Sequence, residues 1–325
     1  MKAIIHTRYG SPDVLQLKEV EKPVPNDGQI LVKIHAASAN PADWHEMRGE
    51  PFLARLTFGL RKPKDVRLGT DIAGHVEAVG SKVTRFHPGD EVFGTCAGGF
   101  AEYATASETK LVLKPANISF EEAAAVPVAA ITALQGLRDK GKIHSGQKVL
   151  VNAASGGVGT FAVQIAKSFG TEVTGVSSTR NLDMVHSIGA DHVIDYTKED
   201  FTKNGQGYDL IYDAVGNHSV SDYKRALRPQ GICAIAGFTT LSRLLEHVLL
   251  GPLISATGKK KIGLMGLAKI TQKDLALLKE LLEDGKVKPV IDKRYLLGET
   301  ADAIRYLEGK HARGKVIITM DHDYQ

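Results

Sequence analysis

The stretch of sequence that decides the fold is KVLVNAASGGVG, at residues 148–159. An apolar run typical of a strand leads into a turn of small residues, and the turn opens an amphipathic helix. Ala153, Gly156 and Gly159 stand where a tight turn, a close backbone approach to a pyrophosphate and helix-on-strand packing need small residues. The sequence therefore predicts a dinucleotide site, with the diphosphate at the helix N-terminus; a turn that needs glycine for packing alone is the alternative. The predicted cofactor contacts of this turn are Ser155, Gly156, Gly157, Val158 and Gly159.

The end of the next strand, near Val176, decides which dinucleotide fits. An acidic side chain there accepts a hydrogen bond from the ribose 2′-hydroxyl, whereas a cationic one accommodates a 2′-phosphate. Ser177, Ser178 and Arg180 follow the strand without a carboxylate, and a guanidinium forms paired hydrogen bonds with phosphate oxygens. NADPH is therefore favoured over NADH. The alternative is that Arg180 begins the next helix as a solvated residue near Asp183.

The rest of this half alternates between apolar strands and helical stretches, which predicts a parallel sheet covered on both faces, the doubly wound α/β pattern. Ligands of such sheets lie beyond the carboxyl ends of the strands, so Val215, Gly216, Gly237 and Phe238 are further cofactor candidates. The predicted strands are 148–151, 172–176, 191–194, 208–213 and 231–236, and the predicted helices are 158–169, 182–188 and 219–227.

The first half of the chain has a different character. Up to about residue 115 it consists of short apolar runs broken by turn residues, which is typical of a β-rich domain. Good helix formers begin near Phe120 and mark the boundary. After Gly237 the pattern is less regular, until a predicted helix at 273–283 and a closing strand at 314–319.

Composition excludes several classes of protein. Of the 325 residues, 43% are hydrophobic and 24% charged, which is typical of globular proteins and excludes disordered, collagen-like and coiled-coil chains. The net charge of +4 comes without a basic block, so no nucleic-acid partner is expected. Cys96 and Cys233 are too few for a disulfide framework or a thiolate zinc site, and the pattern of residues 1–6 leads us to expect no secretion signal. A reducing, cytoplasmic location is expected.

The most apolar later segment, residues 244–254, is interrupted by Glu246, His247 and Pro252. It is shorter than the roughly 20 residues of a membrane-spanning helix, so we expect no such helix, although an amphipathic surface helix fits the pattern. Three lysines follow at 259–261 and allow peripheral membrane contact as an alternative. A buried helix or a dimer contact is the favoured interpretation.

Several motifs stand out along the chain beyond the nucleotide turn. They are GTDIAG at 69–74, VTRFHPGDEV at 83–92, GGFAEY at 98–103, IGAD at 188–191 and HARGKV at 311–316. With these motifs and the nucleotide turn, the chain resembles the zinc-independent quinone oxidoreductase branch of the medium-chain dehydrogenases/reductases, in the subgroup of reticulon-4-interacting protein and enone oxidoreductase. The resemblance implies a homodimer and a GroES-like β-barrel catalytic domain at 1–121, completed by 268–325, with a Rossmann NADPH-binding domain at 122–267.

Departures from the zinc enzymes of that superfamily indicate the reaction. The position of their metal-binding thiolate resembles Asn40, and their Gly-His-Glu motif is replaced by Gly69-Thr70-Asp71, so the metal ligands are missing. Without a Lewis acid, alcohol oxidation loses its main charge stabilisation. A quinone or α,β-unsaturated carbonyl spreads the charge that follows hydride arrival, so a reductase of quinones or enones is expected. Other activated carbonyls are rival substrates, and an NADPH-binding redox-sensing or interaction protein with little turnover is the alternative function.

The resemblance also assigns four residues individually. Asn40 and Thr132, the candidate catalytic residues, are expected near the nicotinamide and its ribose; the Asn40-Pro41 pair could instead form only a turn. Tyr196 is expected beside the adenosine ribose or 2′-phosphate, or else as packing at a strand end. Lys315 is expected to reach the cofactor, or else to be a surface lysine at the start of a strand.

Substrate contacts follow from the residues around Asn40. Trp44 and Phe52 are candidates for an apolar substrate wall, although a lone tryptophan is more often part of a core. Asp43 could orient a polar neighbour. No general acid is assigned, since Asn40, a water molecule and a tyrosine all fit the sequence.

Overall fold

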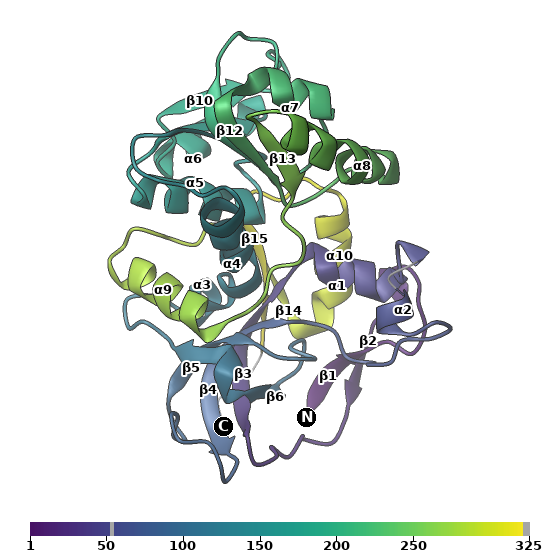
Figure 1. The fold of residues 1–325 in the computed structure, drawn as a ribbon. Helices are drawn as coiled ribbons and strands as arrows, with labels where there is room; N and C mark the ends of the chain where they lie inside the picture. Colours follow the sequence, from purple (N-terminus) through teal and green to yellow (C-terminus); the bar gives the residue numbers. More distant parts are fainter. Residues whose placement is uncertain (53–54, 321–325) are drawn as a thin grey trace. The chain divides into compact units, whose positions relative to one another are not determined.

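The computed structural model describes residues 1–52 and 55–320. They form two compact units, which we call the split unit and the central unit (Figure 1). The split unit comprises Met1–Val128, Ile270–Asp284 and Pro289–Gln325, and the central unit comprises Ala129–Lys269 and Gly285–Lys288.

The central unit contains a six-stranded sheet, whose strands are β8 (Lys148–Asn152), β9 (Glu172–Ser177), β10 (His192–Asp195), β11 (Tyr208–Asp213), β12 (Leu227–Ile235) and β13 (Lys261–Leu264). All neighbouring strands are parallel, in the order β10-β9-β8-β11-β12-β13. The first strand, β8, lies in the middle of the sheet; β9 and β10 follow on one side of it, and β11, β12 and β13 follow on the other. The strand order therefore reverses direction between β8 and β11, as in doubly wound nucleotide-binding folds. The predicted α/β fold is confirmed.

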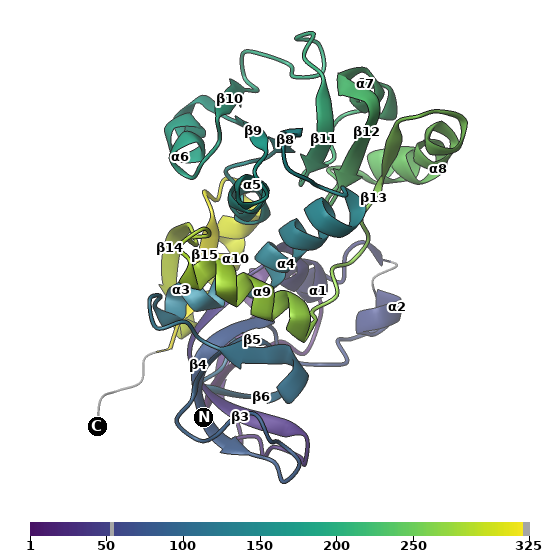
Figure 2. The same cartoon turned by 60° about the vertical axis from the view of Figure 1, so that its left-hand side comes forward.

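Helices connect these strands, because parallel neighbours need a crossover. They are α5 (Gly157–Ser168), α6 (Leu182–Ser187), α7 (Val220–Ala226) and α8 (Leu241–Thr257), and α4 (Pro127–Gln135) with the π-helical turn η4 (Gly136–Lys140) precedes β8. Within this unit, Figure 2 shows α6 beside β9 and β10, and α8 beside β13 at the other end of the sheet. Almost every side chain of α5 from Gly159 to Ala166 is buried, which fixes the turn that precedes it.

The split unit contains a curled, mainly antiparallel sheet and a two-stranded ribbon. Its strands are β1 (Lys2–Ile5), β2 (Gln16–Glu19), β3 (Gln29–Ala39), β4 (Asp71–Val79), β5 (Glu91–Thr95), β6 (Tyr103–Ser107), β7 (Leu111–Leu113), β14 (Ile291–Leu296) and β15 (Lys315–Thr319). The large sheet runs β14-β15-β3-β4-β5-β7, with β6 also on β3. The last strand, β15, pairs antiparallel with β3, so chain segments from both ends share one core. The β-rich character predicted for the first half of the chain is confirmed.

Short helices complete the split unit. They are α1 (Pro41–Arg48), α2 (Arg55–Phe58), α3 (Phe120–Ala124), α9 (Gln272–Glu283) and α10 (Thr300–Glu308), with the 3-10 turns η1 (Pro12–Val14), η3 (Glu108–Lys110) and η6 (Leu297–Glu299). Helix α10 contacts α1, β14 and β15. Helix α1 starts at the end of β3, so the chain turns sharply at Asn40.

The stretch after Gly237 is more regular than its sequence suggests. Residues 241–257 form α8 in spite of Pro252, and β13 adds a sixth strand. The expectation of a buried helix is wrong for α8, because its exposed side chains include Leu241, Leu245, Val248, Leu249, Leu250 and Leu253. Among the described residues no helix is long and apolar enough to cross a membrane.

Candidate functional site

A buried polar cluster lies in the split unit where β3, α1, β4 and β15 meet. We use the name for Ser38, Asn40, Asp43, Asp71 and Lys315, all nearly inaccessible to solvent. Strand pairing creates it: Ser38 of β3 lies opposite Asp71 of β4, and β15 meets β3 at the Val316–Ala39 pair, which brings Lys315 next to Asn40.

Hydrogen bonds fix the orientation of the Asn40 amide. Its Oδ1 accepts a hydrogen bond from Lys315 Nζ at 2.6 Å, and its Nδ2 donates to Asp71 Oδ2 at 2.9 Å and to the Ser38 carbonyl at 3.3 Å. Lys315 Nζ also lies 3.6 Å from Asp71 Oδ2. Because Lys315 is only 3% exposed, the surface-lysine alternative is wrong. Asn40 caps the start of α1, so the sequence correctly places a turn here, but its amide is also held from two sides.

Asp71 is the anchor of this cluster. Its Oδ2 also accepts from Ser38 Oγ at 3.0 Å, and its Oδ1 accepts from the backbone N–H of Val128 at 3.0 Å. Burial raises the pKa of Asp71, while the ammonium of Lys315 and the amide of Asn40 oppose that rise. Burial lowers the pKa of Lys315, against the pull of the two carboxylates of Asp71 and Asp43. The cluster is thus an ion pair whose charges are held by hydrogen bonds rather than by water.

Asp43 lies one helical turn further on and orients a neighbour, as the sequence suggests. Its Oδ2 accepts from the backbone N–H of Asn40 at 2.7 Å. Burial raises the pKa of Asp43 to about 7, although this hydrogen bond favours the charged form. The carboxyl group therefore changes its protonation near neutral pH.

The other predicted substrate and catalytic residues are more scattered. Trp44 is half-buried, contacts the core of the split unit and stacks on His45 with ring centroids 3.6 Å apart. Phe52 is 65% exposed, with the Arg55 guanidinium 5.4 Å from its ring centroid. Thr132 lies on α4 in the central unit, and its carbonyl accepts a hydrogen bond from the hydroxyl of Tyr212 at 3.3 Å.

The glycine-rich turn of the central unit has the predicted geometry. Ala153 has the left-handed φ of 62° that a tight turn needs, and α5 begins at Gly157 with Gly156 as its N-cap. A Cβ on Gly159 would lie 2.0 Å from the carbonyl oxygen of Ala153, so only glycine allows this close packing. At Gly156 the nearest atom to such a Cβ is 3.5 Å away. The turn therefore leaves room beside Gly156 at the N-terminus of α5, which is the positive end of the helix dipole and favours an anionic group.

Hydroxyl groups gather beside this turn at the end of β9. Ser177 Oγ donates to Ser155 Oγ at 2.9 Å, and Asn181 Nδ2 donates to Ser155 Oγ at 3.1 Å and to Ser178 Oγ at 3.2 Å. The Oδ1 of Asn181 is buried without a hydrogen-bond partner among the described residues. A ligand hydroxyl or amino group would satisfy it, so these residues fit a polar nucleotide. Sequence reasoning missed Asn181, since an asparagine after a strand is also an ordinary turn residue.

Two neighbours complete the end of the sheet. Arg180 is exposed, on the 3-10 turn η5 (Thr179–Asn181) that follows β9. Tyr196 follows β10 and is 63% exposed, so its alternative role in packing is wrong. Asp195, the last residue of β10, accepts hydrogen bonds from Thr179 Oγ1 and from Thr197, and these lower its pKa. This carboxylate, which the sequence did not single out, is already engaged by its own neighbours.

A second buried carboxylate, Asp213 at the end of β11, shapes the loop that contains Val215 and Gly216. Its Oδ1 accepts from the backbone N–H groups of both residues at 2.7 Å. Its Oδ2 accepts from Asn152 Nδ2 at 2.9 Å and from the Tyr223 hydroxyl at 2.6 Å. Asn152 ends β8, so this network ties two strand ends together. Sequence reasoning missed it because its hydrogen bonds join residues up to 61 positions apart.

The loops after β11 and β12 touch each other. A Cβ on Gly216, whose φ is 61°, would lie 2.2 Å from the carbonyl oxygen of Gly237. Phe238, the next residue, is 44% exposed. Four predicted cofactor residues therefore lie together beyond the carboxyl ends of two neighbouring strands, where doubly wound sheets bind their ligands.

Comparisons with known proteins agree with this architecture. Residues 26–116 match the alcohol dehydrogenase GroES-like domain, and residues 188–318 match the model described as zinc-binding dehydrogenase. The chain is 38% identical to 2-methylene-furan-3-one reductase of Solanum lycopersicum, over 98% of this chain and 79% of that protein.

Solved structures give the same result. The quinone oxidoreductase of Coxiella burnetii is 31% identical, with a TM-score of 0.85 over 98% of this chain and 99% of that one. The Escherichia coli quinone oxidoreductase, solved in complex with NADPH, is 25% identical, with a TM-score of 0.83 over 98% and 100% of the two chains. The chain therefore belongs to the medium-chain dehydrogenases/reductases, in the family of the quinone oxidoreductases and enone reductases.

Proposed function

We propose that this protein transfers hydride from NADPH to quinones or α,β-unsaturated carbonyls without the help of a metal ion. The relatives support the reaction class, since one is named as a reductase of a methylene-furanone and others as quinone oxidoreductases. The single observation that carries the proposal within this chain is the buried polar cluster, in which an ammonium group lies where Asn40 and Asp71 converge. Its positive charge would repel a divalent cation at that position.

Among the described residues, no three histidine, cysteine or acidic side chains are grouped so that they could hold a metal ion. The donor set around Asn40 is an amide, a hydroxyl and an ammonium group together with two carboxylates, Asp71 and Asp43, and it contains no thiolate or imidazole. Zinc prefers thiolate, imidazole and carboxylate ligands, so the residues themselves favour the metal-free reading.

The central unit supports NADPH as the cofactor. In the proposal, the backbone of Gly156–Gly159 and the N-terminus of α5 bind the diphosphate. Ser177, Ser178 and Arg180 bind the 2′-phosphate, with Tyr196 alongside. The buried Asn181 Oδ1 accepts a hydrogen bond from the adenosine part. Val215, Gly216, Gly237 and Phe238 line the nicotinamide end, and the E. coli relative was solved with NADPH.

When bound, NADPH supplies the hydride. The conjugated acceptor then carries negative charge on its oxygen, which needs a hydrogen-bond donor that is already in place. Asn40 Nδ2 is our candidate: Lys315 holds its Oδ1 at 2.6 Å, and its bond to the Ser38 carbonyl is the longer of its two, at 3.3 Å. In the proposal, the N–H that makes this longer bond donates to the oxygen of the acceptor. Asp43 and Lys315 are positioning residues. Trp44, Phe52 and Thr132 are contacts of substrate or cofactor.

The test is a steady-state assay of NADPH oxidation with a panel of 1,4-quinones and enones, with NADH run in parallel. Turnover with NADPH and either class of acceptor is expected. In Asn40→Ala, kcat should fall by about 10²-fold while the Kd of NADPH stays unchanged. The matched control, Ser38→Ala, removes one hydrogen bond to Asp71 but leaves the Asn40 amide. Tight NADPH binding without turnover across the panel would instead support a redox-sensing or interaction protein.

For the partner, the proposal includes a homodimer formed through β13 and α8. Strand β13 ends the sheet, and among the described strands it pairs only with β12. An unpaired strand edge with an exposed apolar helix beside it suits the same edge of a second copy. Leu249 and Leu253, one helical turn apart, are both exposed on α8.

The double variant Leu249→Glu/Leu253→Glu should be a monomer where the wild type is a dimer, and analytical ultracentrifugation would measure the difference. Leu17→Glu, at an exposed leucine of β2 in the split unit, is the control. A monomeric wild type would contradict the dimer, and a dimer that tolerates both glutamates would contradict the interface through α8. Cosedimentation with anionic vesicles that the glutamates abolish would favour the membrane alternative.

A cytoplasmic location remains part of the proposal. It is supported by the two cysteines, Cys96 and Cys233, which are both free thiols. Burial raises the pKa of Cys96 to about 12, so this thiol is unreactive. Fractionation of cells that express the tagged chain would check the location.

A further inference from the structure

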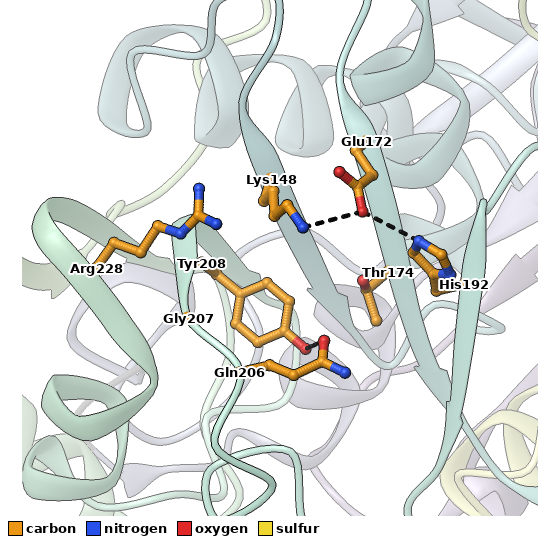
Figure 3. A pocket seen from close by; sticks show the side chains of 8 residues that line it. All are labelled: Lys148, Glu172, Thr174, His192, Gln206, Gly207, Tyr208 and Arg228. Carbon is orange, nitrogen blue, oxygen red and sulfur yellow. Dashed lines mark hydrogen bonds and ion pairs between the residues drawn. The ribbon is translucent and has the colours of Figure 1, made fainter.

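A polar pocket of about 330 Å³ lies in the central unit, apart from the candidate functional residues described above (Figure 3). It opens at the amino ends of the parallel strands: Lys148, Glu172, His192 and Tyr208 are the first residues of β8, β9, β10 and β11, and Arg228 is the second of β12. The glycine-rich turn follows the opposite, carboxyl end of β8. A five-residue strand separates the two, which corresponds to about 15 Å.

Three basic side chains line the wall of this pocket. Lys148, Arg228 and the imidazole of His192 line it, against one carboxylate, Glu172. Lys148 Nζ lies 3.4 Å from Glu172 Oε1, and His192 Nε2 lies 3.0 Å from the same oxygen. In Figure 3 the two groups approach this oxygen from either side. One acidic oxygen is thus shared between two basic groups, and the Lys148 ammonium, which has three N–H donors, keeps donors that Glu172 does not use.

Arg228 is held in place from behind. Its NH1 lies 3.1 Å from Asp209 Oδ2, and that carboxylate also accepts from the backbone N–H of Lys148 at 2.8 Å. A Cβ on Gly207 would lie 2.9 Å from Cγ of Arg228, so the arginine stem passes directly over the bare glycine backbone. A guanidinium has five N–H donors, and the contact with Asp209 uses only part of them. The guanidinium is thus positioned before any ligand arrives.

The floor of the pocket is polar and buried. The ring of Tyr208 is buried, and its hydroxyl donates to Gln206 Oε1 at 3.2 Å. Thr174, also buried, adds a hydroxyl to the lining. Hydroxyl groups and basic side chains around a concave polar surface match a tetrahedral oxyanion better than an apolar molecule.

We propose that this pocket binds a phosphate group, either as inorganic phosphate or as part of a small phosphomonoester. Arg228 and Lys148 contact the phosphate oxygens, Thr174 donates a hydrogen bond, and the His192 imidazole lines the site beside them. This site is separate from the cofactor site and does not depend on the proposed reaction.

The experiment measures phosphate binding to the full chain saturated with NADPH, by calorimetry in a buffer free of phosphate. NADPH fills the other anion site, so saturable binding of inorganic phosphate reports on the new pocket. Arg228→Gln and Lys148→Gln should each weaken binding roughly tenfold or more, since each removes a charge-assisted hydrogen bond. Glycerol phosphate as a second ligand separates the two sources: tighter binding than inorganic phosphate indicates a phosphomonoester, and equal or weaker binding indicates free phosphate.

Two controls keep the result unambiguous. Lys203→Gln makes the same charge change at an exposed lysine paired with Asp200, outside the pocket, and should leave phosphate affinity unchanged. The NMR signals of the His192 imidazole should shift on phosphate addition in the wild type and not in Arg228→Gln. No saturable binding, or equal losses in Lys203→Gln and Arg228→Gln, would overturn the proposal. If NADPH itself fails to bind, the reaction proposed above is contradicted, while the Arg228 and Lys203 comparison still decides the fate of this pocket.

Discussion

The buried polar cluster of the split unit and the glycine-rich turn of the central unit are built in opposite ways. The cluster consists of charged and amide side chains, and its contacts join residues 31 and 275 positions apart. The turn consists of backbone, and residues 153–159 make it almost alone. Side chains that meet over long distances depend on the whole unit being folded, whereas a local turn depends on the absence of side chains. The two sites should therefore fail in different ways when they are mutated.

Lys315→Met should break the cluster with the largest effect. The variant leaves Asp71 buried without its ammonium partner, and removing one member of a buried pair costs about 3–5 kcal/mol of unfolding free energy. Urea unfolding would measure the loss. In the double variant Lys315→Met/Asp71→Asn much of the stability should return, because no buried charge is left unpaired. A single variant as stable as the wild type would show that the ion pair does not hold the unit together.

Asp43→Asn tests the second carboxylate of the cluster through pH. The folded-state pKa of about 7 lies above the ordinary 3.8, so the folded protein binds more protons than the unfolded chain between these values. Asp43 thus adds stability that is full at the acidic end of this window and is lost as the pH rises through the folded-state pKa. The unfolding free energy of the variant should therefore fall less steeply with rising pH than that of the wild type, by up to about 1.4 kcal/mol per pH unit.

Urea unfolding across this pH window would measure that slope. Glu46→Gln serves as a parallel variant, because burial also raises the pKa of Glu46 to about 7. Equal slopes in Asp43→Asn and the wild type would contradict the role of Asp43.

Gly159→Ala and Gly156→Ala separate the two roles proposed for the turn, which are close packing of the backbone and binding of the diphosphate. The new Cβ at residue 159 would meet a backbone oxygen at 2.0 Å, and such overpacking costs about 1–3 kcal/mol of stability. At residue 156 the new methyl group has room within the protein, so stability should stay within about 0.5 kcal/mol. Its methyl group would nevertheless stand where we propose that the diphosphate binds, so NADPH affinity should fall. Thermal unfolding and NADPH titration of both variants would check these expectations. A destabilised Gly156→Ala that keeps its NADPH affinity, together with a Gly159→Ala of wild-type stability, would refute them.

Arg180→Ala should have the smallest effect and sharpen the assignment of the cofactor. Loss of one charge-assisted contact to the 2′-phosphate should weaken NADPH binding by roughly tenfold, since such bonds are worth about 1.5–3 kcal/mol. NADH, which lacks that phosphate, is the internal control and should bind as before. Fluorescence titration with both nucleotides gives the ratio. Equal losses for the two would remove Arg180 from the 2′-phosphate site.

The same contrast explains what the sequence could predict. The central sheet and its glycine turn follow from periodicity and local spacing, so β8, β9, β10 and β11 were predicted to within about two residues at each end. Helix α8 was harder, because Pro252 and an exposed apolar face disguise a helix that covers β13. For the cluster, the sequence pointed to Asn40 and Lys315 separately through the family motifs. No local sequence pattern indicates that β15 places Lys315 next to Asn40, or that Asp213 accepts a hydrogen bond from Asn152. Those contacts depend on which strands pair.

The position of β15 in the chain has a consequence for protein synthesis. Strand β3 and Asp71 leave the ribosome early, but their partner strand and the Lys315 ammonium are made only after the whole central unit. The nascent N-terminal segment must therefore wait with an open sheet edge next to β3 and a carboxylate that has no counter-charge. The central unit, whose sheet comes from one continuous stretch, is free to fold first. Chains that stall before residue 315 are thus expected to be prime substrates for chaperones and proteases.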